Sequence, residues 1–79
     1  MTYKMLSATQ ESETVIVTVE YTFNDNSKQT ILVPIFAPPS MVYIEESVNN
    51  RGITEQQKLD IIAQNTVFVN EINNQNIVE

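Results

Sequence analysis

Residues 14–23 read TVIVTVEYTF and are almost all β-branched or aromatic. NDNS follows at 24–27, and a second largely apolar run, KQTILVPIF, occupies 28–36. β-Branched and aromatic side chains suit the pleated surface of a strand, whereas short polar residues suit a turn. The pattern therefore predicts one long β-hairpin from Thr14 to Phe36.

The length of the hairpin turn decides which side chains share a face, because a slip of one residue moves every side chain to the opposite face. A two-residue turn would set Val17 opposite Pro34 and divide the apolar residues between both faces. A three-residue turn at 24–26 gathers eight apolar side chains on one face and needs a left-handed residue, which we expect to be Asn26. The pairs that this turn predicts are Val15 with Ile35, Val17 with Val33, and Val19 with Ile31.

The position of the hairpin in the sheet follows from proline and from the N-terminal residues. Pro34 cannot donate a hydrogen bond to a neighbouring strand, so residues 28–36 should form an edge. Residues 1–7 alternate weakly between apolar and polar and could add a third strand beside residues 14–23, which would then be central. Residues 8–13 are polar and are expected to form a loop. A two-stranded hairpin and a three-stranded meander both remain open.

A short helix is predicted over 41–51. Ala37-Pro38-Pro39 should end the sheet, because a proline restricts the residue before it and cannot continue a ladder of hydrogen bonds. Ser40 is then a candidate N-cap. Gly52 is the only glycine in the chain and stands where this helix would need a left-handed cap at its C-terminal end.

A longer helix is predicted over 55–73, because Thr54 and Gln57 have the spacing of a capping box. Its apolar side chains cover an arc of about 200°, twice the width that a helix on a single core needs. Asn65 lies inside this arc, either at its rim or as a buried polar residue that sets the register of a helix pair. A short strand at 66–69 is the alternative. The predicted fold is one α+β domain over 1–79, with an antiparallel sheet at 2–36 and both helices packed on one face.

The charged residues argue against several classes of partner. The net charge is −6, and the four basic residues are scattered along the chain: Lys4, Lys28, Arg51 and Lys58. Binding to nucleic acid depends on clustered cations, so neither nucleic acid nor an anionic membrane is expected as a partner. The sequence also has no run that is long and apolar enough to cross a membrane, and it lacks the pattern of a signal peptide at its N-terminus.

The sequence offers no catalytic constellation. The chain has no histidine to activate a serine and no cysteine. Glu45 and Glu46 are neighbours that would point about 100° apart on a helix, which suits a solvated face better than acid–base catalysis. Asp25 lies among turn residues, and one carboxylate is too few for a calcium site. We therefore expect no enzyme activity, no cofactor, no metal and no small-molecule substrate.

Apolar side chains that this fold cannot cover predict a protein partner, either a second copy of the chain or a larger assembly. Half of them are on the second face of the hairpin, and the others are on the longer helix. The candidate interface residues are Ile16, Leu32, Phe36, Ile61, Phe68 and Ile72.

Three segments carry a resemblance to known proteins: residues 15–27, residues 33–38 (VPIFAP) and residues 50–56 (NRGITEQ). In these segments, and in the predicted order of a hairpin followed by helices, the chain resembles small uncharacterised proteins encoded by tailed phages that infect marine cyanobacteria. The resemblance implies a virion component, or an accessory protein that binds and redirects a host protein. It implies a location in the virion or in the host cytoplasm, and it assigns no functional residue.

Overall fold

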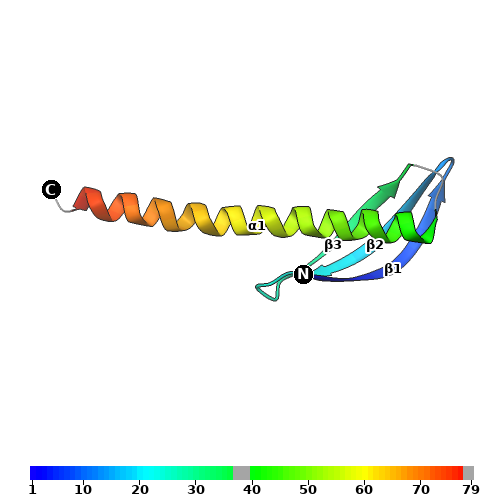
Figure 1. Cartoon of the computed structure of the whole chain (residues 1–79), viewed down its shortest axis with the longest axis horizontal. Helices are drawn as coiled ribbons and strands as arrows, with labels where there is room; N and C mark the ends of the chain where they lie inside the picture. Colours follow the sequence, from blue (N-terminus) through cyan, green and yellow to red (C-terminus); the bar gives the residue numbers. More distant parts are fainter. Residues whose placement is uncertain (37–39, 78–79) are drawn as a thin grey trace.

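The computed structural model describes residues 1–36 and 40–77. Its elements are β1 (Thr2–Glu11), β2 (Thr14–Thr22), β3 (Lys28–Ile35) and α1 (Met41–Ile77). The strands form one antiparallel sheet in the order β1-β2-β3, and α1 crosses one face of this sheet and then runs on beyond it (Figure 1). The predicted α+β class is confirmed, with a three-stranded meander in which β2 is central.

The hairpin of β2 and β3 has the predicted register. Val17 lies opposite Val33, and the other predicted pairs, Val15 with Ile35 and Val19 with Ile31, are also present. In the turn, the Asn26 N–H donates to the Phe23 carbonyl, and Asn26 has the expected positive φ of 67°. β3 is an edge strand, as Pro34 predicted.

β1 is longer than predicted. Residues 1–7 do contribute a strand, but the expected loop at 8–13 is wrong, because β1 continues to Glu11 and turns back through Ser12, with a φ of 55°. A bulge between Met5 and Ser7 inserts Leu6 and lets Ala8 lie opposite Val17. An edge strand with one solvated face tolerates the polar residues of this segment, which is why its polarity did not mark a loop.

One helix replaces the two that were predicted. Ser40 is the N-cap, since its hydroxyl oxygen accepts a hydrogen bond from the Tyr43 N–H at 3.1 Å. Gly52 is not a cap but lies buried inside α1, where a Cβ would stand 2.7 Å from Cε1 of Tyr21. Thr54, the predicted N-cap of a second helix, is also interior and donates to the Asn50 carbonyl. Close packing of the sheet, rather than a helix end, therefore explains the glycine.

Two further expectations concern the ends of the predicted helices. The alternative of a strand at 66–69 is wrong, because these residues are helical, and α1 continues past the predicted end at residue 73 to Ile77. The predicted break at Ala37-Pro38-Pro39 lies outside the described residues.

The core lies between the inner face of the sheet and the first half of α1. Its buried members from the sheet are Val17, Val19, Tyr21, Phe23, Ile31, Val33 and Ile35, and α1 contributes Val48. Ile44 and Leu59 of α1 pack against this cluster. These helix residues recur at intervals that place them on one face, so α1 lies on the sheet from its first turn to about Leu59.

Candidate protein interface

The helix leaves the sheet at the hairpin turn. There the Asn24 N–H donates to Oε1 of Gln56 at 2.9 Å, and the amino group of Met1 donates to Oδ1 of Asn24 at 2.7 Å. Leu59 is the last residue of α1 that packs on the core, and every residue from 60 to 75 is exposed. We call residues 60–75 the overhang. At 1.5 Å per residue it extends about 24 Å beyond the sheet.

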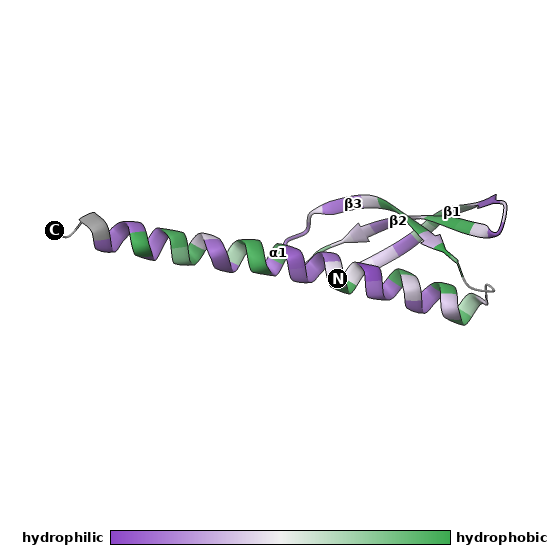
Figure 2. Ribbon diagram, turned by 90° about the horizontal axis from the view of Figure 1, so that it is seen from above, coloured by the Kyte–Doolittle hydropathy of each residue, from purple (hydrophilic) through white to green (hydrophobic). Residues whose placement is uncertain are grey.

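The overhang carries a continuous apolar stripe. Figure 2 shows hydrophobic segments recurring along the part of α1 that projects beyond the sheet. At about 100° per residue, five large apolar side chains fall within an arc of about 120°, with Asn65 at its centre. We call these six residues the stripe: Ile61 (59% exposed), Ile62 (61%), Asn65, Phe68 (50%), Val69 (54%) and Ile72 (57%). Val67 is similarly exposed, at 49%, but lies on another side of the helix.

The stripe has the spacing of a helix–helix seam. Ile62, Asn65, Val69 and Ile72 are separated by three, four and three residues, which is the heptad pattern of helices that supercoil. Ile61 and Phe68 give a second, overlapping seam with the same Asn65 and Ile72. A helix face of this kind fits another helix better than it fits a flat surface.

The overhang is nearly uncharged. Asp60 and Glu71 are its only charged residues, although the whole chain has a net charge of −6. Glu71 is also about 120° away from the centre of the stripe. The ion pairs of α1, from Arg51 and Lys58 to Glu55, lie before the overhang. A second helix could therefore approach the stripe without repulsion between like charges.

The overhang has little intrinsic stability as a helix. Asn, Thr, Val and Ile, which are weak helix formers, supply most of its residues. Helices of this length are marginal in water unless an apolar face packs against something else. Within the described residues, the overhang has no such contact with the rest of the chain. The overhang is therefore the least stabilised part of α1 in the described chain.

The structure separates the predicted interface residues into two surfaces. Ile61, Phe68 and Ile72 lie in the stripe, as described above. Leu32 is 61% exposed and Phe36 is 74% exposed, while Ile16 is half-buried on the same outer face of the sheet, opposite Pro34. Ile16 and Phe36 are near the end of β3 that leads to α1, and Leu32 lies opposite Thr18, midway along the sheet. The overhang projects beyond the other end of the sheet (Figure 1). The two surfaces do not form one continuous patch.

Eight exposed large apolar residues of the described chain were missing from the prediction: Leu6, Met41, Val42, Tyr43, Ile53, Ile62, Val67 and Val69. Ile62 and Val69 belong to the stripe, and the spacing of three, four and three residues along the sequence could have identified them. Leu6 is 47% exposed at the bulge of β1, and no sequence signal marked that bulge.

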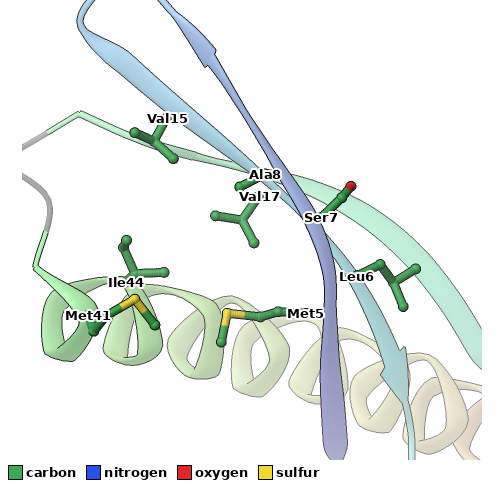
Figure 3. Close-up of a pocket in the computed structure, with 8 residues that line it drawn as sticks. All are labelled: Met5, Leu6, Ser7, Ala8, Val15, Val17, Met41 and Ile44. Carbon is green, nitrogen blue, oxygen red and sulfur yellow. The ribbon is translucent and has the colours of Figure 1, made fainter.

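A small apolar cavity lies between the start of α1 and the middle of β1. Figure 3 shows Met41 and Ile44 of α1 facing Met5 and Val17 of the sheet. The cavity has a volume of about 260 Å³, and its lining is Met5, Leu6, Ser7, Ala8, Val15, Val17, Met41 and Ile44. The Ser7 hydroxyl is the polar side chain in this set, and a serine needs a general base to act as a nucleophile. The lining supplies no such base.

The perturbed titratable groups have structural explanations. Burial raises the pKa of Tyr21, and its hydroxyl donates to the Val48 carbonyl at 2.6 Å. Hydrogen bonds from Ser27 lower the pKa of Asp25, which supports the turn interpretation of that carboxylate. Hydrogen bonds from Lys58, and then from Arg51, lower the pKa of Glu55. None of these three groups lines the apolar cavity between α1 and β1.

Among residues 1–36 and 40–77, no group of three acidic side chains is placed to hold a metal ion. No helical segment in that part of the chain combines the length and apolar character needed to span a membrane. Comparison of the chain with protein-family models, with curated proteins and with solved structures gives no match.

Proposed function

We propose that this chain is a non-enzymatic interaction protein that self-associates through the stripe on its overhang. The observation that carries this proposal is the exposure of five large apolar side chains on a helical segment that none of the other described residues covers. Burying such a side chain contributes about 1.5–3 kcal/mol, so leaving five of them half-exposed forgoes a substantial stabilisation. Contiguous apolar surface of this kind marks a contact site.

A second copy of the chain is the occupant that fits the stripe best. The heptad spacing calls for a helix with the same spacing, and every copy supplies one. The overhang offers almost no charge with which to select a partner of opposite sign, whereas apolar side chains and neutral amides match themselves. Closed symmetry would bury the same stripe on every subunit.

The sheet would then be the part displayed by the oligomer. Its outer face presents Leu32 and Phe36 away from the overhang, so this second surface would remain available for docking on a larger assembly. With the resemblance to phage proteins, this arrangement suits a structural component of a virion. A census of purified virions by mass spectrometry tests that location. A fixed copy number supports it, and absence from virions points to an accessory protein acting in the host.

A pair of substitutions tests the stripe as the contact. Phe68→Asp places a charge in the stripe, so the dissociation constant of the oligomer should rise at least tenfold above that of the unmodified chain. Val67→Asp makes a similar change at a neighbouring exposed position outside the stripe, and it should leave the dissociation constant nearly unchanged. Light scattering coupled to size-exclusion chromatography gives the mass of each variant.

Three results would count against the proposal. Equal effects of the two variants would show that the stripe is not the contact. A monomeric unmodified chain with a fully helical overhang would remove the need for a second copy. A monomeric chain whose overhang becomes helical only in the presence of another protein would replace self-association by a heterologous partner.

A further inference from the structure

We infer that the overhangs associate in parallel and in register, as a closed bundle of at least three chains with Asn65 in a buried layer. This inference rests on the proposed self-association and specifies its geometry. It follows from three features of the stripe: the chemistry of Asn65, the residues on either side of it, and the overlap of two heptad seams.

Asn65 needs a polar partner once the stripe is covered. An amide side chain has two N–H donors and an acceptor oxygen, so one asparagine can pair with another. A buried amide without a partner costs about 1–3 kcal/mol. Because Asn65 stands at the centre of an otherwise apolar stripe, the stripe can be buried only if the partner places a polar group opposite it. Another Asn65 meets that condition.

Only one orientation places Asn65 opposite Asn65 and keeps the rest of the stripe paired. In an antiparallel pair centred on Asn65, residue 72 would meet residue 58, so that Ile72 would face Lys58. In an antiparallel pair centred on the middle of the seam from Ile62 to Ile72, Asn65 would face Val69. A parallel, in-register arrangement places every residue next to the same residue of the other copy. The contact between the helices would then begin after Lys58.

The overlap of the two seams indicates more than two chains. Ile62 and Val69 flank Asn65 on one side, and Ile61 and Phe68 flank it on the other, so each helix has apolar side chains for two neighbours. A dimer would cover one seam, whereas a closed ring of three or more covers both. β-Branched residues at both kinds of core position, here Ile62, Val69 and Ile72, also favour trimers and tetramers over dimers.

Disulfide trapping tests the geometry, because the unmodified chain has no cysteine. Ile62→Cys and Ile72→Cys, made separately, should each form disulfides between identical positions under mild oxidation. Val67→Cys lies outside the stripe and serves as the control, with at least tenfold less cross-linking at the same protein concentration. Sedimentation equilibrium of the reduced proteins should give a mass of three or more chains.

The outcomes separate this inference from the proposed function. If Ile62→Cys and Ile72→Cys cross-link only when mixed, the bundle is antiparallel, and the inference fails while self-association stands. A mass of two chains also overturns the inference alone. If neither the reduced variants nor the unmodified chain associates, the proposed function itself fails.

Asn65 can be tested directly with two matched variants. Asn65→Asp would bury like charges in one layer, so it should weaken association at neutral pH at least tenfold, and acidification that protonates the carboxylate should reverse the loss. Gln64→Asp adds the same charge on an exposed side of the overhang and should have little effect. Equal behaviour of the two variants would place Asn65 outside the bundle core.

Discussion

At Gly52, a missing side chain lets a strand tyrosine reach the backbone of a helix. The Tyr21 hydroxyl donates to the carbonyl of Val48, four residues before Gly52, and the Tyr21 ring is fully buried between Tyr3 and Phe23, with centroid distances of 6.1 and 6.2 Å. A glycine inside a helix costs about 1 kcal/mol relative to alanine. The buried hydrogen bond and the aromatic packing offset that cost.

Gly52→Ala is therefore expected to destabilise the fold despite the better helix propensity of alanine. The new Cβ would stand 2.7 Å from Cε1 of Tyr21 and 2.6 Å from Cε of Met1. The Met1 side chain can move, but the Tyr21 ring is fixed, so we expect a net loss of about 1–3 kcal/mol in the free energy of unfolding. Asn49→Ala, at an exposed position of α1, is the control and should be neutral or slightly stabilising. Urea denaturation measures both, and a more stable Gly52→Ala variant would contradict this packing.

The Tyr21 hydroxyl should make stability sensitive to alkaline pH. Burial raises its pKa above the ordinary value of 10.0, although nearby Arg51 acts in the opposite direction. The unfolded chain therefore loses this proton at a lower pH than the folded chain, and the free energy of unfolding should be intact below about pH 10 and fall above it. Tyr21→Phe should cost about 0.5–1.5 kcal/mol at neutral pH and reduce the alkaline fall. Denaturation curves across this range check the prediction, and an unchanged alkaline fall in Tyr21→Phe would refute it.

Residue-level prediction succeeded at Asn26 and failed at Gly52 for physical reasons. At Asn26, the turn length was forced, because only one register gathers the apolar residues on one face, and that register needs a left-handed residue. At Gly52, a helix cap and a close approach of another chain segment both call for a residue without a Cβ. Sequence alone could not distinguish these two explanations of Gly52, because Tyr21, which approaches it, is distant in the chain.

At the scale of elements, α1 is a single helix with two different environments. Its first half is stabilised by the sheet. Thr54, which suggested a new helix start, donates to the Asn50 carbonyl within the helix instead, and Gln56 accepts a hydrogen bond from the Asn24 N–H of the hairpin turn. Its second half is stabilised by nothing in the described chain. Gly52 and the capping-box spacing from Thr54 predict a break near residue 52. The helix is continuous there because Gly52 packs against Tyr21.

The helicity of the overhang should depend on protein concentration. Because weak helix formers dominate residues 60–75, dilution of an associating chain should unfold the overhang while the sheet remains folded. Circular dichroism at 222 nm, where α-helices give a strong negative ellipticity, should therefore lose signal on dilution below the dissociation constant. The Phe68→Asp variant should give, at every concentration, the weaker helical signal that the unmodified chain gives when it is dilute. A helical signal that is independent of concentration in both proteins would contradict this coupling.

At the scale of the whole molecule, the described chain is elongated. The chain extends over 62 × 21 × 19 Å, with its core at one end and an uncovered helix at the other. The width of the apolar arc in the sequence predicted that some surface would lie uncovered. It could not predict where, because the division of α1 into covered and uncovered halves depends on the length of the sheet, which ends at the 24–26 turn.

Sedimentation equilibrium of the unmodified chain, from micromolar to millimolar concentration, tests self-association most directly. The overhang predicts a mass that rises with concentration to a whole number of chains, three or more, and that falls to one chain in Phe68→Asp. A mass of one chain at every concentration, with the overhang still helical, would contradict self-association.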